Sequence, residues 1–214
     1  MSNWKRLLSY LLPIKEHELE SPISGPLEIC WENGHLALNS GQANYSYNHL
    51  EQVFKGAMKK AGLAHRQVDR VLNLGMGAGS TVKLLRKDFG KDPYIRSIEM
   101  DPLIIELAER YFSIGEDGKH EIICTEALSY VQECMDTFDL ILVDLFIDNE
   151  VTPNVLTMGF IVRLMHLLTA GGVLILNTLP HPASESFKAE LKANGFSPRL
   201  HHSRDNEVFL FLKD

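Results

Sequence analysis

Three glycines alternate with other residues in the segment VLNLGMGAGS, which spans residues 71–80. Gly75, Gly77 and Gly79 allow a tight turn and let a ligand approach the backbone, and the start of a following helix offers unpaired N–H groups. The pattern therefore predicts a ligand-binding loop. An ordinary tight turn between a strand and a helix explains the glycines about equally well, so the loop alone does not decide the matter.

Glu99 stands twenty residues after Gly79, at the end of the next expected strand. A carboxylate at that position can accept hydrogen bonds from both ribose hydroxyls of a nucleoside. Strand ends on this side of an open α/β sheet also form the ligand crevice, which makes a merely solvated strand end a weaker explanation. We therefore expect Glu99 and the adjacent Met100 to belong to a nucleoside-cofactor site.

The glycine spacing separates two classes of cofactor. Dinucleotide-binding loops carry a third glycine where this chain has Ser80, five residues after Gly75. About 115 of the 214 residues follow Glu99, which leaves little room for a second, substrate-binding domain. We therefore predict that the cofactor is S-adenosylmethionine or a close derivative of it.

Composition excludes several classes of protein. The chain has 214 residues, of which 45% are hydrophobic and 23% are charged, as in an ordinary one-domain globule. Its formal net charge of −7 argues against a nucleic-acid surface, and no apolar run reaches the length of a membrane span. Three cysteines without metal-ligand spacing suit a reducing compartment. We expect a cytoplasmic protein that acts on a small molecule, without a signal peptide, a metal site or a membrane partner.

Alternating strands and helices must position the predicted site. Several expected strands are apolar throughout, as in a parallel sheet with both faces covered, so the pattern predicts a doubly wound, mostly parallel α/β sheet. Asp101 and Pro102 mark the clearest helix start. The expected strands are residues 70–74, 94–99, 120–124, 139–145 and 172–177, with a terminal antiparallel hairpin at 198–203 and 207–212. The expected helices are residues 48–61, 79–89, 101–112, 127–135, 153–168 and 183–193.

A separate N-terminal segment is expected to precede this sheet. Residues 1–14 are typical of a short amphipathic helix, and residues 21–26 of a connector rich in turn formers. The Asn33-Gly34 pair between two apolar runs predicts a β-hairpin. We divide the chain into an N-terminal segment, residues 1–47, and a cofactor-binding domain, residues 48–214. The apolar side chains expected on one side of the helix are Trp4, Leu7, Leu8, Leu11 and Leu12.

As a set, these motifs resemble the spermidine synthase-like branch of the class I methyltransferase fold. The similar segments are VLNLGMGAGS, SIEMDPLIIELAERYF, CTEALSYV, FDLILVDLF and LLTAGGVLILN, and the resemblance covers residues 27–214. It implies a Rossmann-like, seven-stranded, mostly parallel sheet with a terminal antiparallel hairpin. It also implies that the small hairpin domain before the sheet is a feature of the family.

The resemblance further implies roles for individual residues. The three glycines of the loop are similar to those that cradle the methionine part of the cofactor, and Glu99 to the residue that holds the ribose. Glu126 and Ala127 stand where the family has an Asp-Ala pair that contacts the adenine. Glu126 has an equally good alternative as a charge at a helix start. Asp144 is similar to the carboxylate that orients and deprotonates the attacking amine, although it could also cap a loop.

This chain departs from the pattern of the polyamine-making members. Asp144 is followed by Leu-Phe-Ile without the usual hydroxyl residues and second aspartate, and Asp148 lies one residue late. Tyr47-Asn48-His49 lacks the family's glutamate, and Ala78 replaces an aspartate in the glycine loop. Because burial of a diamine's charged ends needs paired carboxylates, these losses weaken the prediction of a diamine substrate.

Three functional hypotheses follow. The departures favour methyl transfer to an unidentified small molecule, with Asp144 as the catalytic residue and Tyr47 and Asp148 near the substrate. Aminopropyl transfer, which makes a polyamine, is the alternative and would use decarboxylated S-adenosylmethionine. The third hypothesis is a protein that binds the cofactor without turnover. A homodimer is left open as the assembly.

Overall fold

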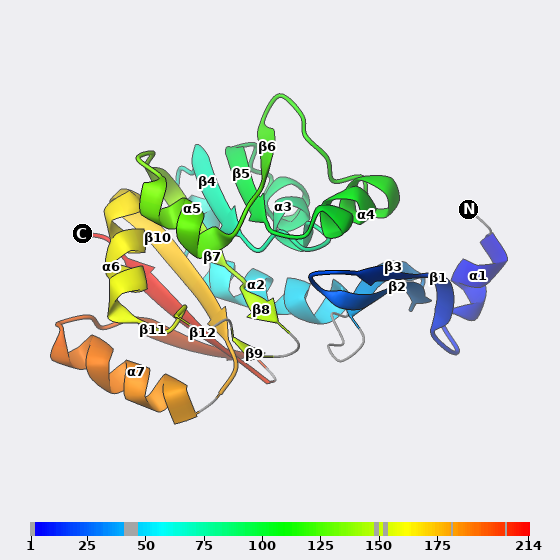
Figure 1. Ribbon diagram of the computed structural model, residues 1–214. Coiled ribbons are helices and arrows are strands. Elements are labelled where there is room, and N and C mark those ends of the chain that lie inside the picture. The colour runs from blue at the N-terminus through cyan, green and yellow to red at the C-terminus, as the bar shows by residue number, and fades with distance from the viewer. Residues whose placement is uncertain (1–2, 41–46, 148–149, 152–153, 181, 204) are drawn as a thin grey trace.

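A seven-stranded sheet forms the centre of the protein in the computed structural model, which describes residues 3–214 except for 41–46, 148–149, 152–153, 181 and 204 (Figure 1). In spatial order its strands are β11 (Arg199–Ser203), β12 (Asn206–Leu212), β10 (Leu168–Thr178), β7 (Phe138–Val143), β4 (Arg70–Leu74), β5 (Tyr94–Glu99) and β6 (His120–Cys124). Strands β10, β7, β4, β5 and β6 pair in parallel, whereas β12 is antiparallel to both of its neighbours. The predicted mostly parallel sheet with a terminal antiparallel hairpin is confirmed.

The strand order brings together the two loops that follow the neighbouring central strands β4 and β7. Strands β4 and β7 are neighbours in the sheet, although β5 and β6 come between them in the sequence. From β4 the chain adds β5 and β6 on one side, and it then returns to add β7 on the other side of β4. The chain therefore reverses its direction of travel across the sheet beside β4, and ligands of open α/β sheets bind beyond the carboxyl ends of the strands at such a point. Both the glycine loop after β4 and Asp144 after β7 lie there.

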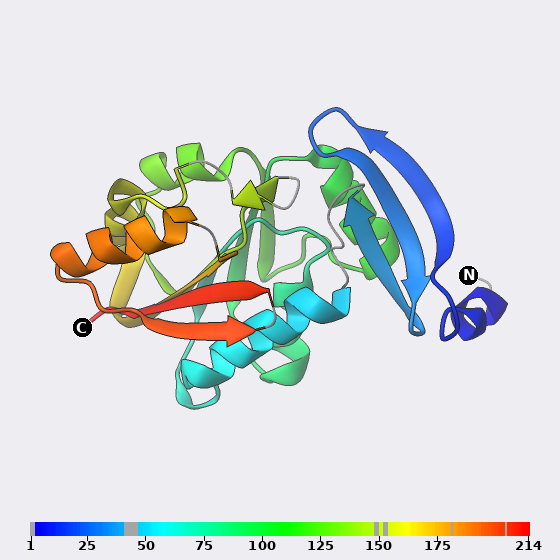
Figure 2. The same ribbon diagram turned by 90° about the horizontal axis from the view of Figure 1, so that it is seen from below.

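Helices cover both faces of the sheet (Figure 2). One face carries α2 (Tyr47–Lys60), α3 (Ser80–Lys83) and α4 (Pro102–Phe112), and the other carries α5 (Ala127–Glu133), α6 (Met158–Leu167) and α7 (Pro182–Ala193). A single-turn π segment, η2 (Leu84–Asp88), continues α3, and a short 3₁₀ turn, η1 (Leu63–His65), follows α2. The predicted helical stretch 79–89 is thus helical from Ser80 to Asp88. It starts after Gly79, whose φ of 76° makes it the N-cap of α3, and its second half is a π segment.

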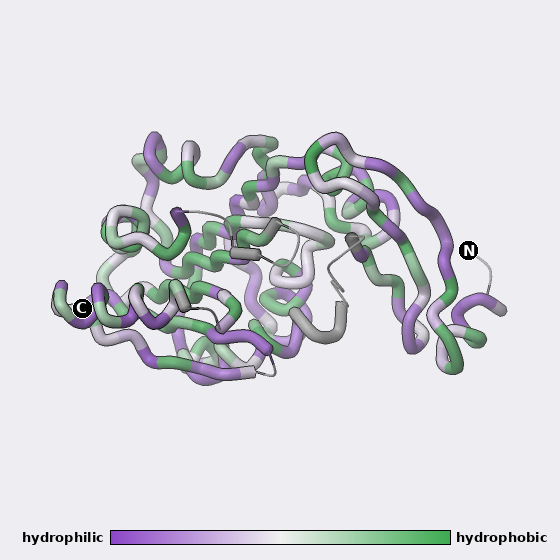
Figure 3. Tube along the Cα trace, turned by 60° about the horizontal axis from the view of Figure 1, so that its bottom comes forward, coloured by the Kyte–Doolittle hydropathy of each residue, from purple (hydrophilic) through white to green (hydrophobic). Residues whose placement is uncertain are grey.

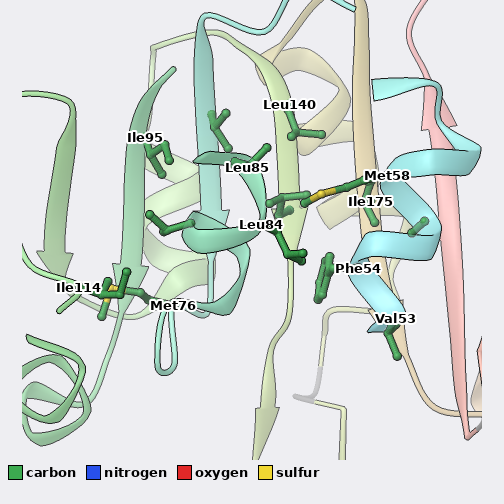
Figure 4. Close-up of a cluster of buried hydrophobic side chains, with 14 of the residues drawn as sticks. Val53, Phe54, Met58, Met76, Leu84, Leu85, Ile95, Ile114, Leu140 and Ile175 are labelled. Atoms are coloured by element: carbon green, nitrogen blue, oxygen red, sulfur yellow. The ribbon is translucent and has the colours of Figure 1, made fainter. Parts of the chain in front are cut away.

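Apolar side chains fill the space between the sheet and each helical layer. The central strands are mostly hydrophobic along their length (Figure 3), as strands covered on both faces must be. On the face of α2 and α3, Phe54 and Met58 pack with Leu84 and Leu85 against Leu140 of the sheet (Figure 4). Met76 of the glycine loop belongs to the same buried cluster, so the loop is packed against this layer.

Helix α6 begins later than expected. The predicted helix 153–168 starts instead at Met158, because the Thr157 side chain accepts a hydrogen bond from the Phe160 N–H and so caps the helix there. At its other end the chain passes directly into β10, whose first residue, Leu168, pairs with Phe138 of β7. The structure thus extends the predicted strand 172–177 at both ends.

A second, three-stranded antiparallel sheet precedes the central one. The predicted hairpin is confirmed as β2 (Gly25–Glu32) and β3 (His35–Ser40), with positive φ angles at Asn33 and Gly34 in its turn. Strand β1 (Ile14–Ser21) pairs with β2 and was not predicted, because its sequence IKEHELES lacks a clear alternation of apolar residues. The expected connector 21–26 is therefore the turn region of a β1–β2 hairpin.

The N-terminal helix α1 (Asn3–Leu8) is shorter than predicted. Its Lys5 pairs with Glu16, so the polar edge of the helix faces the small sheet. Leu11 and Leu12 follow in a turn rather than in the helix, and they are 80% and 69% exposed. Pro13 and the start of β1 keep the helix short, so Leu11 and Leu12 do not join the apolar face of α1. None of the helices in the described residues has the length and apolarity of a membrane span.

Candidate active site

The glycine loop leaves β4 at Gly75 and passes directly against the loop that leaves β7. Gly75 has a φ of 81°, and its N–H donates to the carbonyl of Ile98 on β5 (3.0 Å). A Cβ atom at this position would lie 2.1 Å from the carbonyl oxygen of Asp144. Gly75 is therefore required both for its backbone conformation and for the contact between the two loops.

We expect Gly75→Ala to lower the free energy of unfolding by well over 1 kcal/mol, because it adds a backbone clash to the cost of a left-handed conformation. Gly77→Ala is the matched control. Gly77 also has a positive φ, of 51°, but no atom lies within 4 Å of the Cβ that the substitution would add. Denaturant unfolding of both variants measures the difference. Equal destabilisation by the two substitutions would show that the Asp144 carbonyl can move aside and does not exclude a side chain at position 75.

The other two glycines keep the middle of the loop open. Gly77 donates its N–H to Glu99 Oε2 (3.0 Å) and has open space where a side chain would stand. Gly79 packs against Ile114, which a Cβ would meet at 2.6 Å. The backbone at Gly77 is thus accessible to a ligand, whereas Gly79 anchors the start of α3.

Glu99 lies at the carboxyl end of β5 and holds the loops on both sides of it. Its side chain is only 8% exposed and accepts hydrogen bonds from the N–H groups of Gly77, Met100 and Asp101 at 2.9–3.1 Å. Burial raises the pKa of Glu99, and the three N–H donors act in the opposite direction. Each carboxylate oxygen has two lone pairs, so Oε2 keeps an acceptor site for a ligand hydroxyl beyond Gly77. The residues present therefore fit an adenosyl cofactor.

Asp101 connects this site to the N-terminal sheet. Its carboxylate caps α4 by accepting from the Leu103 N–H (2.9 Å), as predicted, and it also accepts from the hydroxyl of Ser21 at the end of β1. Asp101 is fully buried. Ser21 was missed by sequence reasoning, since 80 residues separate the partners and no local pattern joins them.

Glu126, Ala127 and Met100 are the residues predicted to lie near the adenine. Both carboxylate oxygens of Glu126 accept N–H groups of α5, from Leu128 (2.8 Å) and Ser129 (2.7 Å). Partial burial favours the neutral acid, but these N–H groups outweigh it and lower the pKa of Glu126. Glu126 thus caps the helix, Ala127 is buried behind it, and Met100 is 40% exposed beside Glu99. Contact of these three residues with an adenine stays a prediction.

Asp144 immediately follows β7 and is partly buried. Its N–H donates to the Leu74 carbonyl (2.9 Å), and its Oδ1 accepts from Asn177 Nδ2 (2.9 Å). Burial raises the pKa of Asp144 to about 6; the Asn177 hydrogen bond lowers it, and the nearby charge of Glu99 raises it. A carboxylate with this pKa is largely ionised at neutral pH and can accept a proton from a reacting group.

Asn177 and Asn206 are part of the site but were not predicted to be. Asn177 ends the expected strand 172–177, so the strand-end argument that identified Glu99 applies to it equally well. Asn206 lies at the start of β12 and donates to Asn177 Oδ1 (3.0 Å). Nothing in the local sequence distinguishes Asn206 from an ordinary turn residue.

The predicted substrate residues are only partly placed. Tyr47 begins α2, but its side chain and the whole of Asp148 lie outside the described residues. A short unpredicted hairpin of β8 (Phe146–Ile147) and β9 (Glu150–Val151) directly follows Asp144 and Leu145. The chain after Asp144 therefore forms a short antiparallel pair before it reaches α6.

Comparisons with known proteins show which family and which fold the chain resembles. Residues 55–193 match the family model described as Spermine/spermidine synthase domain. A polyamine aminopropyltransferase from Vibrio vulnificus (strain CMCP6) is 28% identical over 125 residues, which cover 56% of this chain. The match spans only 42% of that relative's length.

Two solved structures share the architecture. Human Methyltransferase-like protein 13 in complex with SAH has a TM-score of 0.63 and 20% identity, with 78% of this chain and 82% of that chain covered. A spermidine synthase in complex with the transition state analogue AdoDATO has a TM-score of 0.61 and 18% identity, with 94% and 73% covered. The fold is that of the class I methyltransferases, as predicted.

Proposed function

Because this chain belongs to the spermine/spermidine synthase family, we propose that it transfers an aminopropyl group from decarboxylated S-adenosylmethionine to an amine. The observation that carries the transfer to an amine is the position of Asp144, and the family match favours the aminopropyl group as the group that moves. Its partly buried carboxylate has a pKa of about 6, and its backbone contacts the glycine loop that would hold the donor. A proton acceptor thus stands next to the expected donor site.

The donor would be held by the loops around Glu99. The Glu99 carboxylate, which the Gly77 N–H already orients, would hold the ribose, and the open backbone at Gly77 would accommodate the part of the donor that carries the sulfur. When bound, the donor supplies a carbon made electrophilic by the positive sulfur. The remaining task of the protein is to align an amine with that carbon and to exclude water.

Asp144 activates the acceptor. An amine attacks only through its free lone pair, so the ionised carboxylate must orient the amine and take a proton from its nitrogen. The new C–N bond forms as the C–S bond breaks, the electron pair of the broken bond stays on sulfur, and the proton ends on Asp144. These steps need no metal or redox partner for their balance.

Support for aminopropyl transfer comes from the family match and from the Vibrio vulnificus relative. This support ranks aminopropyl transfer above methyl transfer, whereas the departures in the sequence favour methyl transfer. Methyl transfer is the second candidate, because the same fold binds SAH in human Methyltransferase-like protein 13. The two reactions share the proton acceptor and differ in the donor and in the group that moves.

Calorimetric titration with the two donors, followed by product analysis, tests the proposal. We expect decarboxylated S-adenosylmethionine to bind at least about tenfold more tightly than the carboxylated form, a difference of about 1.4 kcal/mol. Incubation with a panel of linear diamines should release methylthioadenosine. Tighter binding of S-adenosylmethionine, with release of S-adenosylhomocysteine, would replace this proposal with methyl transfer. Binding of neither donor would exclude both.

A further inference from the structure

We propose that Asn177 and Asn206 are positioning residues that fix the carboxylate of Asp144 in its proton-accepting orientation. This inference rests on the proposed function only for the proton that Asp144 receives. The hydrogen bonds on which the inference is based join side chains of the protein and involve no bound ligand. They run from β12 through β10 to the loop after β7, and so join three neighbouring strands at one edge of the site.

The three residues form one chain of hydrogen bonds. Asn206 Nδ2 donates to Asn177 Oδ1 (3.0 Å), and Asn177 Nδ2 donates to Asp144 Oδ1 (2.9 Å). Asn177 is 1% exposed and Asn206 is 8% exposed, so water does not compete freely for either amide. Asn177 pairs with Val208, and Asn206 stands two residues before Val208 on the same face of β12. The antiparallel pairing of β10 with β12 therefore brings the amides together.

The charge of Asp144 determines the direction of every bond in this chain. An ionised carboxylate can only accept hydrogen bonds, so Asn177 must turn its NH₂ group toward Asp144. Its Oδ1 then faces Asn206, which must donate. If the Asn177 amide turned over, its oxygen would face the carboxylate and the buried acceptors would repel each other. Asn206 prevents this by holding the Asn177 oxygen.

Anchoring of Oδ1 leaves Oδ2 as the atom that receives the proton. Among the described residues, Asn177 is the group that donates to the Asp144 side chain. The carboxylate is thus held through Oδ1, and none of the described hydrogen bonds uses Oδ2. A fixed acceptor is needed for an amine that must be aligned with the reacting carbon.

The anchor also determines where Asp144 titrates. The charged group that acts on it is Glu99 of β5, which disfavours ionisation, while β10 contributes the neutral donor Asn177 and the glycine loop contributes backbone at Gly75. Glu207, next to Asn206, alternates onto the opposite face of β12 and pairs with Lys188. Loss of the Asn177 donor should therefore raise the pKa of Asp144, since burial and Glu99 both oppose ionisation.

Carbon-13 NMR of labelled aspartate carboxyl groups tests this in the whole protein without any substrate. The resonance of Asp144 is assigned by its loss in Asp144→Asn. We expect its midpoint, about pH 6 in the wild type, to rise by about one pH unit in Asn177→Leu. Asn206→Leu should shift it in the same direction by less, because the Asn177 amide then turns over part of the time.

Asn73→Leu is the control for a purely structural loss. Asn73 is a 1% exposed amide on β4 that bonds Ser97 and Thr81 and does not touch Asp144. It should lower stability without moving the Asp144 midpoint. An unchanged midpoint in a folded Asn177→Leu or Asn206→Leu protein, or the same shift in Asn73→Leu, overturns the inference.

Turnover separates this inference from the proposed function. If the protein transfers aminopropyl groups, the acid limb of kcat in Asn206→Leu should move upward with the NMR midpoint while the KM of the donor is unchanged. If no donor binds but the midpoints still shift as expected, the proposed function fails and the positioning of Asp144 stands. If donors bind and turn over but the midpoints do not move, the proposed function stands and the positioning of Asp144 by the two asparagines fails.

Discussion

Glu99→Ala is expected to weaken binding of S-adenosylmethionine and of its decarboxylated form at least about a hundredfold, or about 3 kcal/mol. The substitution removes the acceptor for a ribose and also the common acceptor of three backbone N–H groups, at Gly77, Met100 and Asp101. The glycine loop then loses the hydrogen bond that joins Gly77 to the end of β5. Calorimetric titration of each donor into wild-type and variant protein measures the effect.

Glu106→Ala provides the matched control for this experiment. Glu106 is exposed on α4, seven residues after Glu99, and it makes no contact with the glycine loop among the described hydrogen bonds. Its loss removes the same charge from the same region of the chain and should leave donor affinity within about twofold of the wild type. Unchanged donor binding in Glu99→Ala would remove the basis for placing the cofactor here.

Asp144→Asn is expected to lower the rate of group transfer about 10²- to 10⁴-fold while donor affinity is retained. The amide has the shape of the carboxylate and can still accept from Asn177, but it cannot take a proton from the amine. Activity of the wild type should fall as the pH decreases through about 6, because Asp144 then becomes protonated. The residual activity of the variant should lack this acid limb. The measurement is methylthioadenosine release from about pH 4 to about pH 8, which extends about two units on each side of the midpoint.

Stability distinguishes a catalytic loss from a folding defect in the same variant. The pKa of Asp144 is raised by folding, from 3.8 to about 6, so the folded state binds the proton more tightly than the unfolded state. Asp144 therefore costs stability at neutral pH, and this cost disappears as the pH falls below its unfolded pKa. Asp144→Asn should leave the free energy of unfolding at pH 7 unchanged or raise it by on the order of 1 kcal/mol.

Asp92→Asn is the control for both measurements. Asp92 is an exposed partner of Lys119, and we expect neither the transfer rate nor its acid limb to change when it is replaced. A rate near the wild-type value in Asp144→Asn, with the acid limb intact, would assign proton acceptance to another group.

Local patterns were sufficient to predict the central sheet and half of the site. The strand bounds of β4, β5 and β6 agree with those expected, because each is a short segment with β-branched or other apolar residues that lies between predicted helices. Gly75 and Gly79 were identified because a tight turn needs left-handed backbone there, and Asp101 because a helix start needs a side-chain acceptor. These requirements act between residues a few positions apart.

Other features depended on which strands become neighbours. Asn177 reaches Asp144 across 33 residues, and Asn206 reaches Asn177 across 29, only because β7, β10 and β12 lie side by side. Ser21 meets Asp101 across 80 residues through the unpredicted strand β1. A buried amide and a surface amide look alike in a sequence, since burial is a property of the packed elements around them.

The sequence by itself determined the glycine loop, the strand-end carboxylate Glu99 and the alternating α/β order, because backbone conformation and hydrophobic period are local. Only the tertiary structure decided that Leu11 and Leu12 face solvent and that two buried amides direct the carboxylate of Asp144. Those outcomes depend on hydrogen bonds and contacts between distant segments, whose geometry exists only once the sheet has assembled.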